Sequence, residues 1–118
     1  MNTFYTMEKH TQILIALLKV NKIKKIVASP GTTNICLVAS LQSDPFFEIY
    51  SCVDERSAAF IAVGLAAESG EPVALSCTGS TASRNYIPGL TEAYYRKLPV
   101  LAITASQHLG RVDQYYSQ

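Results

Sequence analysis

Apolar residues recur along the chain in two alternating patterns, one with a helical spacing and one of short continuous runs. Residues 6–20 carry the helical spacing at Met7, Ile13, Leu14, Leu17 and Leu18. Short apolar or β-branched runs ended by Gly, Pro or charged residues are typical of buried strands. The pattern predicts helices over 6–20, from a cap at 32–34 to about 41, over 57–69 and over 82–96, and buried strands over 25–29, 47–53, 72–77 and 99–104.

This alternation predicts parallel strands joined by crossover helices. The expected fold is therefore α/β, with three α/β/α layers and a mainly parallel sheet covered on both faces. A length of 118 residues suits a single domain with one core, so we expect residues 1–118 to form one unit. Pro88 and Gly89 interrupt the helical pattern over 82–96, because proline removes a backbone donor.

Composition and charge exclude several classes of protein. Hydrophobic residues make up 48% of the chain and charged residues 16%, which excludes a disordered or low-complexity segment. Ten Lys and Arg residues against nine Asp and Glu give a net charge of +1, so no nucleic-acid partner is expected. Lys19, Lys22, Lys24 and Lys25 lie where the first helix should end, where cations complement the helix dipole; a partner contact is the alternative.

The cysteines and the N-terminal residues indicate a cytoplasmic location. The chain has an odd number of cysteines, Cys36, Cys52 and Cys77, which form no CxxC pair and lie in apolar runs. We therefore expect buried neutral thiols in a reducing compartment. Two histidines leave little material for a metal centre. Glu8 and Lys9 do not fit a secretion signal, and the longest apolar run is far shorter than the roughly 20 residues of a membrane-spanning helix.

The loops that follow the predicted strands are candidate ligand sites, because ligands bind beyond the carboxyl ends of parallel strands. Four loops qualify: residues 30–33, 54–56, 78–81 and 105–114. Gly31 and Gly79 would let the backbone approach a ligand closely. Neither a GxGxxG nor a P-loop motif is present, so ordinary tight turns are the alternative, and no GxSxG motif supports a serine hydrolase.

Glu55 is the candidate for proton chemistry. It follows an apolar strand and precedes an Ala-rich helix, so its carboxylate is expected to be partly desolvated and able to share a proton with a ligand nitrogen. The alternative is that Asp54 or Glu55 simply caps the helix near Ser57, where the dipole favours a carboxylate. The local sequence leaves both interpretations open.

Several segments together resemble the N-terminal pyrimidine-binding (PYR) domain of thiamine-diphosphate-dependent enzymes. They occur in the family's order and cover nearly the whole chain: IVASPG at 26–31, VDERSAAF at 53–60, AVGLA at 62–66, PVALSCTG at 72–79, PGLTEAY at 88–94 and LPVL at 98–101. Within that family the motifs are most similar to those of the menaquinone-pathway synthases that make 2-succinyl-5-enolpyruvyl-6-hydroxy-3-cyclohexene-1-carboxylate.

The resemblance implies a catalytic role for Glu55 and cofactor contacts for the loops. Glu55 matches the glutamate that hydrogen-bonds N1′ of the aminopyrimidine and so promotes removal of the thiazolium C2 proton, which prepares the cofactor to attack a 2-oxoacid. The implied cofactor-binding residues are Pro30, Gly31, Glu55, Thr78, Gly79, Ser80, Thr81 and Gln118. The implied substrate-side residues are Thr32, Thr33 and Gln114.

The chain also departs from the family's pattern. Thr33 stands where the synthases carry a polar or cationic anion-binding residue, and residues 105–109 lack their arginine–proline pair. A dicarboxylate or isochorismate substrate is therefore disfavoured, and a different 2-oxoacid reaction is expected. No segment matches the family's diphosphate-binding and Mg²⁺-binding motif.

These departures lead to expectations about partners. We expect an incomplete PYR domain, inactive alone, that pairs with a diphosphate-binding domain or subunit holding the Mg²⁺, and that forms a homodimer through the Glu55 helix. The alternative is a non-catalytic binding or dimerisation module.

Overall fold

The computed structural model describes residues 5–106 as alternating helices and strands. In chain order the elements are α1 (Lys9–Val20), β1 (Lys25–Ala28), the 3₁₀ helix η1 (Thr32–Asn34), α2 (Ile35–Ser43), β2 (Glu48–Ser51), α3 (Glu55–Ser69), β3 (Val73–Thr78), α4 (Thr81–Arg84), α5 (Ile87–Arg96) and β4 (Val100–Ala105). The predicted order of helices and strands is confirmed.

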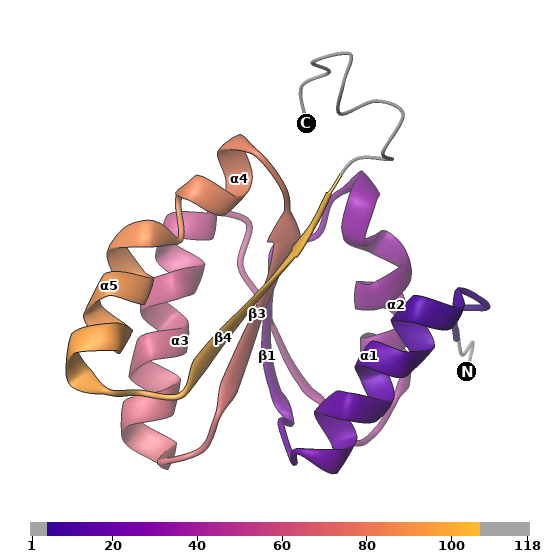
Figure 1. Ribbon diagram of the computed structural model, residues 1–118, viewed down its shortest axis with the longest axis horizontal. Coiled ribbons are helices and arrows are strands. Elements are labelled where there is room, and N and C mark those ends of the chain that lie inside the picture. The colour runs from indigo at the N-terminus through magenta and orange to yellow at the C-terminus, as the bar shows by residue number, and fades with distance from the viewer. Residues whose placement is uncertain (1–4, 107–118) are drawn as a thin grey trace.

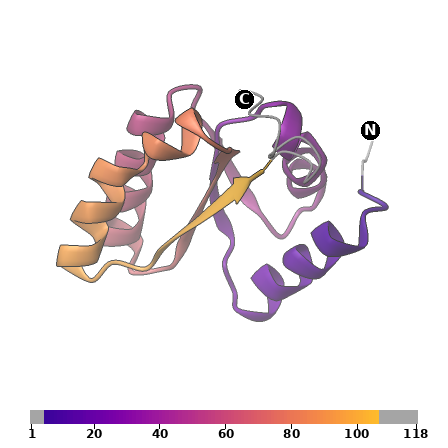
Figure 2. The ribbon, with the colours of Figure 1, turned by 45° about the horizontal axis from the view of Figure 1, so that its top comes forward.

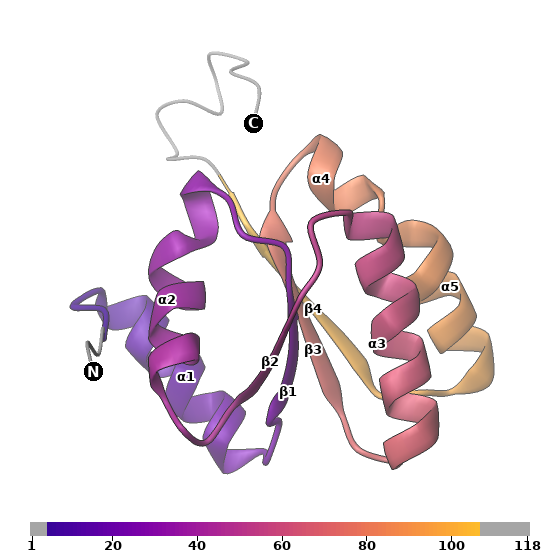
Figure 3. The ribbon, with the colours of Figure 1, turned by 180° about the vertical axis from the view of Figure 1, so that it is seen from behind.

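All four strands are parallel and lie in the order β2-β1-β3-β4 (Figure 1). Helices α1 and α2 cover one face of the sheet, and α3 and α5 cover the other (Figures 1 and 3). The predicted three-layer α/β/α fold is therefore confirmed. The chain leaves β1 for β2 on one side and later returns to β3 on the other side, so the loops after β1 and β3 flank the point where ligands bind in such sheets.

Side chains of the central strands alternate between two apolar cores, one under each helical layer. Ile26 and Ala74 belong to the core beside α1 and α2, which also contains Ile15, Leu18, Leu37, Leu41 and Phe47. Val27 and Leu75 belong to the core beside α3 and α5, with Ala58, Ala59, Ala62, Ala66, Val73, Cys77 and Tyr86. The two cores hold the carboxyl ends of β1 and β3 in fixed positions.

Small residues let α3 and α5 approach each other closely, and both helices lie side by side in Figure 2. Gly89 of α5 lies against Ala59 of α3, and a Cβ atom added to Gly89 would lie 2.5 Å from the Ala59 Cβ and 3.0 Å from its carbonyl carbon. Only glycine fits there. The Ala-rich sequence of α3 therefore serves close packing, which fixes the helix that begins at Glu55.

Three sequence predictions about individual elements were wrong. The strand expected to be buried, β2, is largely exposed, with Tyr50 at 37%, because among the described strands it pairs only with β1 and lies at the sheet edge. The helix expected over 82–96 is two helices, and Pro88 lies in the first turn of the second, where its missing N–H costs nothing. The first helix begins at Lys9 rather than at Thr6.

The lysine cluster and the cysteines partly follow expectation. Lys19, in the last turn of α1, lies 2.6 Å from the Asp44 carboxylate, and Lys25 lies 3.3 Å from that of Glu48. Cys77 is buried, but the prediction of burial was wrong for Cys36 and Cys52, which are only half-buried. Across residues 5–106, no helix is both long and apolar enough to cross a membrane.

Candidate functional site

The turn after β1 is tied to β3 by the buried side chain of Asn34. Its Oδ1 accepts a hydrogen bond from the Gly31 N–H at 2.7 Å, and its Nδ2 donates to the Ser29 carbonyl at 3.3 Å and to Ser76 Oγ at 3.1 Å. The Ser29 N–H also donates to the Ser76 carbonyl at 2.8 Å. The sequence suggested Asn34 only as a helix cap. Its contact with Ser76, 42 positions away, carries no local signal.

Gly31 brings the loop after β1 against the loop after β3. A Cβ atom at Gly31 would overlap the Thr78 methyl group, so only glycine permits this approach. The structure thus brings together two segments that the sequence predicted as site loops. Pro30 beside Gly31 is exposed.

The loop after β3 carries an unusual backbone conformation at Ser80. Its φ of 55° and ψ of −122° are sparsely populated by residues with a side chain. The Ser80 carbonyl accepts hydrogen bonds from Ser83 Oγ at 2.8 Å and from the Arg84 N–H at 3.3 Å, which start α4. Gly79 is buried, whereas Ser80 and Thr81 are exposed. Such conformations cluster at ligand-binding sites, so this loop is a strong site candidate.

The sequence left open whether Asp54 or Glu55 caps the helix, and the structure shows Asp54 in that role. Asp54 is the N-cap of α3, and its carboxylate accepts hydrogen bonds from Ser57 Oγ at 2.6 Å and from the Ser57 N–H at 3.2 Å. These bonds lower the pKa of Asp54. Glu55 is the first residue of α3 and is half-buried. Because Asp54 satisfies the helix end, the Glu55 carboxylate is not needed as a cap.

Two buried side chains, Cys77 and Tyr86, interact electrostatically with Glu55 and stay neutral. Burial raises the pKa of the Cys77 thiol and lifts the pKa of Tyr86 far above its usual value. The negative charge of Glu55 acts in the same direction on both groups. Cys77 and Tyr86 are therefore held in their neutral forms beside the Glu55 carboxylate.

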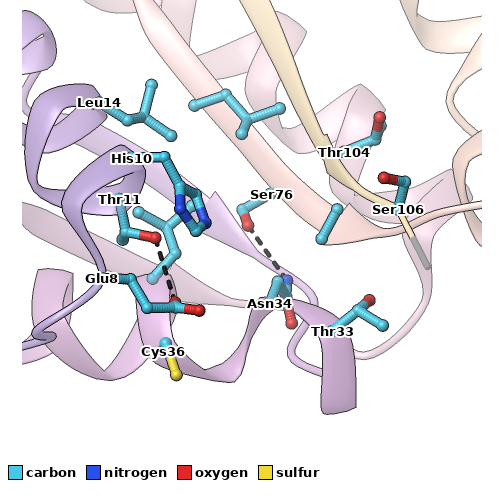
Figure 4. A pocket seen from close by; sticks show the side chains of 13 residues that line it. Glu8, His10, Thr11, Leu14, Thr33, Asn34, Cys36, Ser76, Thr104 and Ser106 are labelled. Atoms are coloured by element: carbon cyan, nitrogen blue, oxygen red, sulfur yellow. Dashed lines mark hydrogen bonds between the residues drawn. The ribbon is translucent and has the colours of Figure 1, made fainter. Parts of the chain in front are cut away.

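A cavity of about 710 Å³ lies on the other side of the sheet, between α1, α2 and the ends of β3 and β4 (Figure 4). Its wall combines carboxylate, hydroxyl and apolar groups: Glu8, His10, Thr11, Leu14, Thr33, Asn34, Cys36, Leu37, Ser76 and residues 103–106. Thr33 is thus placed at a cavity, whereas Glu55 and residues 78–81 do not line it. Asn34 and Ser76, which are hydrogen-bonded to each other, both line the cavity.

The remaining predicted site residues are only partly placed. Thr32 is exposed at the start of η1. Gln114 and Gln118 lie outside the described residues. Within residues 5–106, no group of three or more His, Cys, Asp or Glu side chains could hold a metal ion.

Relatives of known name align with most of this chain. The chain is 44% identical over 114 residues to the 2-succinyl-5-enolpyruvyl-6-hydroxy-3-cyclohexene-1-carboxylate synthase of Porphyromonas gingivalis, an alignment that covers 97% of this chain and 20% of the relative. A synthase of the same name from Christiangramia forsetii is 43% identical over 100 residues, or 85% of this chain and 17% of the relative. The chain spans about a fifth of the length of these relatives.

Solved structures share the fold. A benzoylformate decarboxylase from Polynucleobacter necessarius superposes with a TM-score of 0.80 at 24% identity, covering 93% of this chain and 20% of that one. A thiamine diphosphate-dependent 4-hydroxybenzoylformate decarboxylase from Rhodococcus jostii RHA1 superposes with a TM-score of 0.81 at 17% identity, covering 91% of this chain and 20% of that one. At these identities the likeness establishes the fold alone.

The family itself follows from a match over nearly the whole chain. Residues 8–118 match the family described as thiamine pyrophosphate enzyme, N-terminal TPP binding domain. The match includes the turn at Gly31, the start of α3 at Glu55 and the loop after β3. The resemblance expected from the sequence is thereby confirmed, and the chain belongs to the N-terminal TPP binding domains of the thiamine pyrophosphate enzymes.

Proposed function

We propose that this chain supplies the pyrimidine-binding part of a thiamine-diphosphate-dependent enzyme that acts on a 2-oxoacid, with Glu55 as its catalytic carboxylate. The observation that carries the proposal is the position of Glu55. It is half-buried, begins α3 directly after the Asp54 cap, and lies at the same edge of the sheet as the loops after β1 and β3.

The residues at this edge fit the aminopyrimidine of thiamine diphosphate. Glu55 would share a proton with the ring nitrogen N1′. Its buried neighbours Cys77 and Tyr86 are held neutral, so they would not compete with the ring as charged partners. The backbone at Gly31 and Ser80 would border the ring, where close contact with Thr78 and an unusual φ shape the loops. When bound, the cofactor supplies the carbanion chemistry that 2-oxoacid decarboxylation or ligation requires.

A second domain would complete the site. Val53, two residues before Glu55, is 88% exposed, and Phe60 and Ile61 further along α3 are 45% and 42% exposed, so these apolar side chains remain uncovered. We propose that a diphosphate-binding domain or subunit, which also holds Mg²⁺, covers these side chains, and that two copies of the protein pair through the Glu55 helix.

The relatives favour their own reaction, the synthesis of 2-succinyl-5-enolpyruvyl-6-hydroxy-3-cyclohexene-1-carboxylate, as the first activity to assay. We propose the cavity at Thr33 as the substrate side. Among its described lining residues none is Arg or Lys. We therefore expect the described residues to contribute little to recognition of a second carboxylate, so that monocarboxylic 2-oxoacids compete well with dicarboxylic ones.

The experiment is Glu55→Gln in the complete enzyme, with exchange of the cofactor's C2 proton for deuterium as the readout. The amide keeps the size of the side chain but cannot share a proton at N1′, so exchange should slow by at least about 100-fold. Glu68→Gln, an exposed substitution on the same helix, is the matched control. Unaltered exchange in Glu55→Gln would refute the catalytic role, whereas cofactor binding without exchange in the unmodified protein would favour a non-catalytic module.

A further inference from the structure

The hydroxyl of Tyr86 is buried without a partner. The residue is 1% exposed, and its oxygen makes no hydrogen bond to any other residue in the range 5–106. A buried hydroxyl without a partner is costly, since it loses its hydrogen bonds to water and gains none. Native structures rarely keep such a group unless it serves a ligand, a water or a movable side chain.

Two polar side chains that interact with this hydroxyl, those of Ser29 and Cys77, donate their own hydrogen bonds to other groups. Ser29 Oγ donates to the Cys52 carbonyl at 2.5 Å, and Cys77 Sγ donates to the Thr78 carbonyl at 2.9 Å. Both side chains lie near enough to Tyr86 to contribute to its pKa, yet neither meets the geometry of a regular hydrogen bond with the hydroxyl. Ser29 Oγ and Cys77 Sγ keep lone pairs, but because neither is in hydrogen-bond geometry with Tyr86, its proton is open to another acceptor.

Glu55 is the acceptor that the packing favours. The Tyr86 side chain shares a core cluster with Ala58 and Ala59. These two residues are three and four positions after Glu55, so all three lie on one face of α3 within a single turn. Burial is the main cause of the raised pKa of Tyr86 and of Cys77, and the nearby charge of Glu55 adds to it at both groups.

We propose that Tyr86 is a positioning residue for Glu55: its hydroxyl donates a hydrogen bond to the Glu55 carboxylate, directly or through one enclosed water molecule. The proposal rests on the proposed function of Glu55. A carboxylate offers two oxygens and about four acceptor sites. If the Tyr86 hydroxyl binds one carboxylate oxygen, the other oxygen stays available to a ligand nitrogen. A charge-assisted bond of this kind fixes the carboxylate more firmly than a neutral one.

The test compares Tyr86→Phe with Tyr94→Phe in the complete enzyme. Tyr94 lies on the same helix, α5, but is 74% exposed, so its hydroxyl serves as the control. With saturating thiamine diphosphate, Tyr86→Phe should slow C2 proton exchange by about tenfold and lower the melting temperature by a few degrees. Tyr94→Phe should leave both quantities unchanged.

Two further outcomes separate the proposal from its alternatives. If the hydroxyl has no partner in solution, Tyr86→Phe removes an unsatisfied group, and melting should rise while exchange stays unchanged; this overturns the proposal. In a Glu55→Ala background, where no cofactor chemistry is needed, the melting effect of Tyr86→Phe should disappear. If it persists in full, the hydroxyl serves another group, for example Ser29, and the proposal is wrong.

The proposed function is tested independently of this inference. If Glu55→Gln leaves exchange unaltered, the catalytic role fails, whatever the melting data show. If Glu55→Gln abolishes exchange but Tyr86→Phe matches Tyr94→Phe, only the positioning role of Tyr86 fails.

Discussion

The contact between α3 and α5 makes a sharp prediction about two glycines. In Gly89→Ala the new Cβ would lie 2.5 Å from the Ala59 Cβ and 3.0 Å from its carbonyl carbon. Ordinary carbon contacts are about 3.5–4.0 Å, so the two helices must separate by roughly 1 Å. Overpacking of this kind costs about 1–3 kcal/mol, and the better helix propensity of alanine returns at most about 1 kcal/mol. We expect a net loss of about 1–2 kcal/mol in the free energy of unfolding.

Gly64→Ala is the matched control, because Gly64 lies in α3 and a Cβ atom there meets nothing within 4 Å. This change should stabilise the protein by about 0.5–1 kcal/mol through helix propensity alone. Urea unfolding followed by circular dichroism should therefore shift the two midpoints in opposite directions, by about 1–2 M in total. Equal shifts, or a stabilising effect of Gly89→Ala, would refute the packing argument.

Two further predictions concern the site loops. Gly31→Ala should destabilise the protein by about 1–3 kcal/mol through overlap with the Thr78 methyl group, and Thr78→Ser, which removes that methyl, should restore most of the loss in thermal melting of the double variant. The hydrogen bonds from Ser57 lower the pKa of Asp54 in the folded protein. The stability that the ionised Asp54 contributes is therefore fully present above its pKa in the unfolded chain, near pH 4, and is lost as the pH falls through its lower pKa in the folded protein. Asp54→Asn keeps a good cap but cannot titrate, so its melting temperature between pH 6 and 2.5 should fall less than that of the unmodified protein; identical profiles would contradict the assignment.

The order of elements and the parallel sheet could be predicted because they depend on local patterns. Helix α3 can be recognised from short stretches of sequence: its Asp54 cap, the Ala-rich run after Glu55 and its end at Gly70. The position of Glu55 at the carboxyl edge follows from the βα order alone. These features survive in the structure because packing and propensity agree along α3.

The features that sequence reasoning missed depend on distant neighbours. The exposure of β2 is decided by its place at the sheet edge, which its apolar residues do not encode. The bond between Asn34 and Ser76 joins segments that only the fold brings together, and so does the overlap of Gly31 with Thr78. The orphaned hydroxyl of Tyr86 is likewise invisible in a sequence, because an unsatisfied group is defined by what surrounds it.

The attachment of Glu55 to the first turn of α3 makes its direction a matter of helical phase. Each residue of an α-helix turns the chain by about 100° and advances it by about 1.5 Å. A single residue inserted between Glu55 and the buried Ala58 would therefore swing the carboxylate about a quarter of the way around the helix, while the same insertion in the turn at Gly70 would leave it in place. The two ends of this helix should thus differ sharply in the insertions they tolerate, and a reporter peptide is best placed at the Gly70 end.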